Sequence, residues 1–123
     1  MAEPAGHSTQ RDGHAAETLA CRHLEAQGLR LIARNVRSPF GEIDLLMREG
    51  ETLVFVEVRR RGSERFGTPA ETVGARKQQR LRATAAHYLQ QHPQESQKPC
   101  RFDILAISDE GRARRIEWLR DAF

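Results

Sequence analysis

One apolar segment that contains a carboxylate constrains the fold of this chain most. Residues 52–58 read Thr-Leu-Val-Phe-Val-Glu-Val, and three arginines, Arg59 to Arg61, follow directly. Alternate side chains of a strand share a face, so Phe55, Glu57 and Arg59 are expected on the same side. An ionised carboxylate among apolar neighbours is costly unless a positive charge meets it. Glu57 therefore needs either a cationic side chain or a metal ion beside it.

Length and composition indicate one globular domain. A chain of 123 residues, 38% of them hydrophobic, can bury a core without disulfides or metal staples. No apolar run approaches the roughly 18 residues of a membrane span. The N-terminal residues lack the apolar segment of a secretory signal, which favours a cytoplasmic location. Cys21 and Cys100 show neither disulfide-framework nor metal-site spacing and are expected in the core.

Apolar periodicity and turn residues predict the order of elements. Residues 1–12 are expected to form a flexible tail, and residues 13–123 a single domain. The expected helices run from about Asp12 to 27 and from a capping box at 68–71 to about Gln91. The expected strands are residues 29–36, 41–47, 52–58, 101–108 and 112–119, with a loop at 59–67. The order αβββαββ predicts an α/β fold with a mixed sheet of about five strands and a helix on either side.

Both expected helices place a charged residue on an apolar face. Glu17 falls within a stripe of small residues on the first helix, and Lys77 lies on the inward face of the second. Glu17 could form a salt bridge with an arginine or belong to a site. Lys77 could pack its stem and extend to solvent, or belong to the same site. The stripe of the first helix also contains Gly13, Ala20, Cys21 and Leu24. The inward face of the second also contains Val73, Leu81, Thr84 and Tyr88.

A second strand carboxylate is expected beside Glu57. In residues 41–47 the acids Glu42 and Asp44 alternate with the apolar Ile43, Leu45 and Met47. A hairpin about Glu49 and Gly50 brings Asp44 level with Glu57. Carboxylates in a partly dry pocket repel one another, and a hard divalent cation, Mg²⁺ or Mn²⁺, would offset the repulsion. By contrast, Asp103 is isolated in its strand and is expected to be structural.

The basic residues are of an unusual kind, because only Lys77 and Lys98 among the 20 are lysines. Arginine binds phosphate bidentately and suits nucleic acid. A genome-wide bias toward arginine codons is the alternative explanation. The clusters near the expected site nevertheless predict a nucleic-acid-binding surface. Its candidate residues are Arg60, Arg61, Arg65, Arg76 and Arg80.

Several short motifs of this sequence resemble those of one family. They are Gly13-x-x-x-Glu17, Asn35, Gly41-Glu42-Ile43-Asp44-Leu45, Phe55-Val56-Glu57-Val58, Phe66-Gly67-x-Pro69, Lys77 and Arg101-Phe102-Asp103. From about Gly13 to Phe123 the chain is similar to the YraN family of small bacterial proteins. The resemblance implies a restriction-endonuclease-like core of the PD-(D/E)xK nuclease superfamily, which is similar to archaeal Holliday-junction resolvases.

The resemblance also implies a Mg²⁺ site. Asp44 and Glu57 would bind the metal, with the Val58 carbonyl as a further ligand, and Glu17 would support the metal or its water. The superfamily places a lysine two residues after the second acid, where this chain has Arg59. Arginine can stabilise negative charge on a phosphate but cannot deprotonate water. Either the metal needs no such help, or Lys77 supplies the ammonium, or the domain binds nucleic acid without cutting it.

The sequence therefore predicts a Mg²⁺- or Mn²⁺-dependent endonuclease-like protein that acts on DNA rather than RNA, with branched or junction DNA as a candidate substrate. Its predicted catalytic residues are Glu17, Asp44, Glu57, Arg59 and Lys77, of which the three acids are the predicted metal ligands. The alternative is a catalytically inactive nucleic-acid-binding module on the same fold. A protein-interaction scaffold is a third possibility. Relatives in the superfamily dimerise, so a homodimer is a further expectation.

Overall fold

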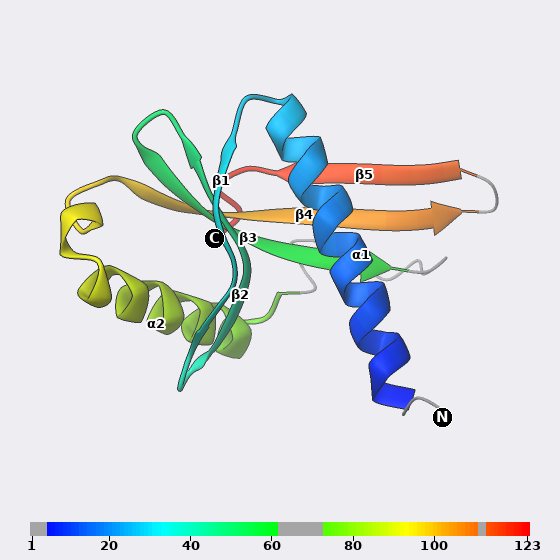
Figure 1. Cartoon of the computed structure of the whole chain (residues 1–123), viewed down its shortest axis with the longest axis horizontal. Coiled ribbons are helices and arrows are strands. Elements are labelled where there is room, and N and C mark those ends of the chain that lie inside the picture. Colours follow the sequence, from blue (N-terminus) through cyan, green and yellow to red (C-terminus); the bar gives the residue numbers. More distant parts are fainter. Residues whose placement is uncertain (1–4, 62–72, 111–112) are drawn as a thin grey trace.

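Figure 1 presents the computed structural model of the chain, in which residues 5–61, 73–110 and 113–123 are described. Helix α1 (Ala5–Ala26) precedes the strands β1 (Arg30–Ser38), β2 (Gly41–Glu49) and β3 (Thr52–Arg61). Helix α2 (Ala75–Gln91) and a short 3-10 helix, η2 (Pro93–Glu95), precede β4 (Cys100–Glu110) and β5 (Ala113–Leu119). Apart from η2, this is the predicted order αβββαββ.

The five strands form one sheet in the order β1-β2-β3-β4-β5. Neighbouring strands are antiparallel except β3 and β4, which run parallel. Parallel neighbours need a long connection, and α2 lies within it. The predicted α/β class and mixed sheet are therefore confirmed.

A separate apolar core lies on each face of the sheet. On one face, Ala20 and Leu24 of α1 pack over Val54 and Val56. On the other face, Leu81 of α2 packs in a cluster that includes Phe55 of β3. Figure 1 shows the two helices on different sides of the strands. The predicted helix on either side of the sheet is confirmed.

The alternation of side chains along β2 reverses at Asp44. Ile43 belongs to the core under α2, whereas Leu45 and Met47 belong to the core under α1. Regular alternation would put residues 43 and 45 on one face. The expectation that Ile43 shares a face with Leu45 and Met47 is therefore wrong. The reversal coincides with the point at which β2 stops pairing with β3.

Both helices begin at residues other than those predicted. Helix α1 begins at Ala5 rather than near Asp12, which shows that a polar segment without apolar periodicity can still continue a helix. Helix α2 begins at Ala75, after Gly74 in an extended conformation with φ −74° and ψ 174°. The capping box expected at residues 68–71 lies outside the described residues. The end of α2 at Gln91 is as predicted.

Three smaller expectations are also corrected. Strand β3 extends to Arg61, so the loop expected at 59–67 begins as strand, and its remainder lies outside the described residues. Cys21 is buried as predicted, but Cys100 is exposed at the start of β4. Gly13 is exposed and does not belong to the buried stripe of α1. None of the described helices is long and apolar enough to cross a membrane.

Candidate active site

The sheet opens between β2 and β3, past the paired residues Leu45 and Val56. Beyond that pair, β2 remains joined to β1 as far as Gly41, while β3 remains joined to β4 to its end. Figure 1 shows the far end of the β1–β2 hairpin turned away from the other strands. Asp44 and Glu57 are the next residues on the two sides of the opening. The prediction that the β2–β3 hairpin brings them level is confirmed.

The Asp44 carboxyl is held by the backbone of the neighbouring strand. The Val58 N–H donates a hydrogen bond to Asp44 Oδ2 over 2.8 Å. Burial, followed by the negative charges of Glu57 and Glu17, raises the pKa of Asp44 to about 7, although the Val58 N–H and the charge of Lys77 oppose the rise. The upward shift means that burial first, and the neighbouring acids second, disfavour the ionised form of Asp44. An additional cation would be stabilised there.

Glu57 meets a cationic side chain from α2. Its side chain is 5% exposed, and Lys77 Nζ lies 2.7 Å from Glu57 Oε2. Arg59 Nη1 lies 3.4 Å from the same oxygen. The Lys77 side chain is 37% exposed, so its ammonium reaches Glu57 and solvent at once. Glu57, Lys77 and Arg59 are therefore brought together as the sequence predicted, and Lys77 makes the closer contact.

Glu17 approaches the opening from α1. Asn35 Nδ2 lies 3.2 Å from both carboxylate oxygens of Glu17, and Arg34 Nη2 lies 3.5 Å from Oε1. The charge of Glu17 also contributes to the raised pKa of Asp44. Of the two interpretations left open by the sequence, the salt bridge with an arginine is confirmed, and a role of Glu17 in a metal site stays a prediction. Glu17 forms a loose ion pair with an arginine and it borders the carboxylate site.

Asn35 is a residue of this region for which the sequence predicted no role. Its Nδ2 also donates to Glu42 Oε2 over 2.7 Å, so one amide links two carboxylates. Asn35 has a φ of 53°, in the left-handed region that asparagine tolerates better than most residues. Asparagine is depleted in strands. An asparagine inside an otherwise regular strand pattern is thus the signal that could have identified it.

The acids around the opening offer a metal ion few protein ligands. Within residues 5–61, 73–110 and 113–123, no three His, Cys, Asp or Glu side chains are grouped so that they could hold a metal ion. Glu17 therefore borders the pair formed by Asp44 and Glu57 without completing a three-residue cage. Mg²⁺ usually keeps several waters and takes one or two protein carboxylates. Two carboxylates with an excess of negative charge fit that requirement.

The arginines predicted to bind phosphate are divided between the two faces. Arg76 and Arg80 are exposed on α2. Arg60 is exposed on the opposite face, where it lies near α1. The end of β3, Arg61, is described by its backbone alone, and Arg65 lies outside the described residues. Because alternate strand residues point to opposite sides, the predicted basic surface is not one patch.

Asp103 of β4 is structural, as predicted. The residue is fully buried. Its oxygens accept hydrogen bonds from Arg101 Nε at 3.0 and 3.2 Å, from Trp118 Nε1 at 2.9 Å and from the backbone N–H of Asp121 at 2.9 Å. These donors join β4 to β5 and to the residues that follow it.

Comparison with known proteins identifies relatives over most of the chain. The model of the uncharacterised protein family UPF0102 matches residues 16–107. A UPF0102 protein of Nitrosococcus oceani is 51% identical over 94% of this chain and 94% of its own length. A UPF0102 protein of Shewanella amazonensis is 53% identical over 90% of this chain and 97% of its own length. One from Nitrosomonas europaea is 51% identical over 94% of this chain and 96% of its own length.

Proposed function

We propose an activity for this chain, which belongs to the family UPF0102, as the YraN resemblance implied. The proposed activity is that of a divalent-metal-dependent nuclease-like protein that acts on DNA, and it is argued from the chain's own site. The observation that carries the proposal is the pair of carboxylates at the opening between β2 and β3, with Lys77 Nζ 2.7 Å from one of them. Acids, an ammonium and a partly open position are what phosphodiester hydrolysis requires.

Asp44 and Glu57 would hold Mg²⁺ or Mn²⁺. When bound, such a cation supplies Lewis-acid polarisation of a phosphate oxygen and lowers the pKa of water. The Val58 N–H fixes Asp44, and the raised pKa of Asp44 supplies the physical reason for binding a cation, because neutralising the excess charge favours the ionised acid. Glu17 would influence the metal site without binding the metal directly, through its charge and its contact with Asn35.

Lys77 is the better candidate than Arg59 for the group that orients water. Its ammonium is compact, carries rotatable donors and lies closer to Glu57 than the Arg59 guanidinium does, at 2.7 Å against 3.4 Å. The Arg59 guanidinium cannot deprotonate water but can stabilise negative charge on a phosphate oxygen. In this arrangement the superfamily's lysine is supplied by α2 and Arg59 faces the phosphate. A restriction-endonuclease-like core is part of the proposal.

The exposed arginines of α2 would contact the nucleic-acid backbone. Arg76 and Arg80 are carried by the same helix as Lys77 and are exposed. Contacts of this kind are electrostatic, so binding should weaken steeply with salt. An inactive binding module would share this property, since the ion pair between Lys77 and Glu57 already neutralises Glu57 without a metal.

The experiment that tests the proposal measures cleavage and binding side by side. Labelled duplex, single-stranded, flap and four-way-junction DNA would be incubated with wild type, Asp44→Asn and the control Glu42→Gln, in Mg²⁺, Mn²⁺ or EDTA. We expect salt-sensitive binding by all three proteins, and cleavage only by wild type and Glu42→Gln with metal present. Binding without cleavage under every condition would identify the inactive module. Absence of salt-sensitive binding would reject both.

A further inference from the structure

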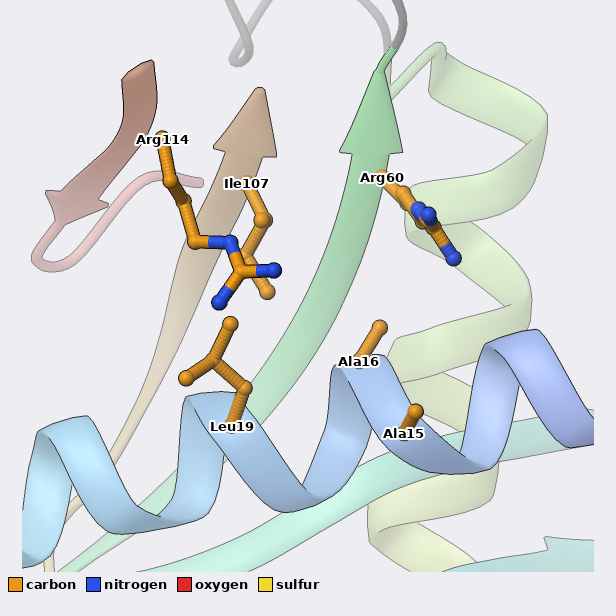
Figure 2. A pocket seen from close by; sticks show the side chains of 6 residues that line it. All are labelled: Ala15, Ala16, Leu19, Arg60, Ile107 and Arg114. Carbon is orange, nitrogen blue, oxygen red and sulfur yellow. The ribbon is translucent and has the colours of Figure 1, made fainter. Parts of the chain in front are cut away.

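A hollow lies between α1 and the strands on the face of the sheet opposite Lys77. Figure 2 shows Ala15, Ala16 and Leu19 of α1 facing Ile107 of β4, with Arg60 of β3 and Arg114 of β5 beside them. Its volume is about 220 Å³. We call it the α1–sheet pocket, and its lining residues are Ala15, Ala16, Leu19, Arg60, Ile107 and Arg114.

The lining of this pocket combines an apolar surface with two guanidinium groups. Methyl and aliphatic groups of α1 and β4 form the apolar part, and the described residues of the lining include no acid. Both Arg60 and Arg114 also take part in interactions within the chain, which would restrict the positions of the guanidinium groups. Guanidinium groups bind phosphate and carboxylate groups bidentately. The lining therefore suits an anionic ligand with an apolar part.

The size of the pocket restricts the ligand further. Pockets for drug-sized ligands enclose about 300–1,000 Å³, so a hollow of about 220 Å³ holds one ring system and leaves an attached sugar phosphate at its rim, where Arg60 and Arg114 are exposed. A dinucleotide would not fit inside it. A nucleobase has an apolar face that packs on aliphatic side chains and is joined to a phosphate, so a single nucleotide supplies both required parts.

We propose that the α1–sheet pocket binds one nucleoside phosphate unit, with the phosphate at Arg60 and Arg114 and the base against α1. The choice of a nucleotide over other anions rests on the proposed function. The unit could be a free mononucleotide or one residue of a strand whose cleaved phosphate lies at Glu57. Arg60 is three positions along β3 from Glu57 and points to the other face of the sheet, so a strand that reaches both would have to pass around the end of β3.

The test is calorimetry in EDTA, so that the result does not depend on metal or cleavage. The probes are dAMP, inorganic phosphate and a 5′-phosphorylated oligothymidine. The variants are Arg60→Gln, Arg114→Gln and Ala15→Phe, the last of which fills the pocket from an exposed position. Arg30→Gln, at an exposed arginine of β1, is the control. Circular dichroism of each variant checks that it is folded.

We expect dAMP or the oligonucleotide to bind, and each pocket variant to weaken that binding at least about tenfold, the usual effect of losing one charged hydrogen bond. Arg30→Gln should leave dAMP binding unchanged. An effect on the oligonucleotide alone would identify a strand as the source of the nucleotide. The proposal is overturned if no probe responds to the pocket variants, or if inorganic phosphate binds as tightly as dAMP. Cleavage without pocket binding would leave the proposed function intact.

Discussion

Asp44 and Asp103 lie on strands on either side of β3 and differ in how their charge is met. Asp103 is fully buried and accepts hydrogen bonds from Arg101, Trp118 and the backbone of Asp121. Asp44 accepts one from the Val58 N–H, and burial, followed by the negative charges of Glu57 and Glu17, raises its pKa to about 7. One carboxylate is surrounded by fixed donors, and the other by further acids.

This difference separates a structural acid from a candidate catalytic one. A buried charge that fixed donors satisfy stabilises one arrangement of the chain and needs no ligand. A carboxylate whose neighbours are also acidic stores unfavourable energy until a proton or a cation arrives. The network around Asp103 extends to Glu49, whose pKa is lowered mainly by its hydrogen bond with Arg101. The region around Asp44 has the opposite electrostatic character.

The largest effect is expected from Lys77, on the catalytic side of the comparison. Lys77→Met removes the ammonium next to Glu57 and should reduce metal-dependent cleavage about 10²–10⁴-fold, the usual contribution of general acid–base help. Mn²⁺ binding should persist, because a competing cation leaves Glu57. Lys98→Met, at the chain's other lysine, is the matched control. If Lys77→Met still cleaves DNA and Arg59→Lys raises the rate of cleavage, the group that orients water is at residue 59 instead.

The structural role of Asp103 should be measurable as a contribution to the free energy of unfolding. Asp103→Asn removes the fully buried charge that pairs with Arg101 and should lower the free energy of unfolding by about 3–5 kcal/mol, as breaking a buried pair usually does. Denaturant unfolding in EDTA measures the change. The same substitution at position 44 should not destabilise the metal-free protein. A large loss of stability in Asp44→Asn would mean that Asp44 is also structural, and the contrast would collapse.

The stability of the metal-free protein should depend on pH through Asp44. Because its folded pKa of about 7 exceeds the ordinary 3.8, the folded state binds its proton more tightly than the unfolded state. This stabilisation is complete below pH about 4 and is lost as the pH rises through about 7, by about 1.4 kcal/mol per unit of pKa shift. Unfolding curves across this range should be flatter for Asp44→Asn. Identical profiles for the two proteins would contradict the excess negative charge.

The smallest effect is expected from Glu17. Its contact with Arg34 is long, at 3.5 Å, so Glu17→Gln should change stability by no more than about 1 kcal/mol. Because Glu17 borders the site without completing it, Mn²⁺ affinity should fall by about tenfold, the lower end of the effect of an outer partner. Calorimetry and denaturant unfolding of the same variant separate the two. A large stability loss with unchanged affinity would identify a purely structural residue.

The sequence predicted the sheet and the pairing of the acids because both follow from local patterns. Strand alternation and a short turn near Gly50 were enough to bring Asp44 close to the level of Glu57, although the turn residues are Gly50 and Glu51 rather than Glu49 and Gly50. A helical wheel was enough to point Lys77 inward. These features depend on spacing along one element or across one short turn.

Features that depend on several elements could not be predicted in the same way. The reversal of β2 at Ile43 depends on the separation of the β1–β2 hairpin from β3. The role of Asn35 depends on its contacts with acids from α1 and β2. The start of α1 at Ala5 lies in a segment where apolar periodicity gives no signal. The α1–sheet pocket combines side chains of four elements, including the separate residues Arg60 and Arg114.

The central claim, that Asp44 and Glu57 form a divalent-cation site, is tested most directly by calorimetric titration with Mn²⁺. Wild type should show saturable binding, and Asp44→Asn should bind at least about tenfold more weakly, because the excess negative charge is gone. Glu42→Gln changes a more exposed acid of the same strand and should bind as wild type does. Equal Mn²⁺ affinity in wild type and Asp44→Asn would contradict the account.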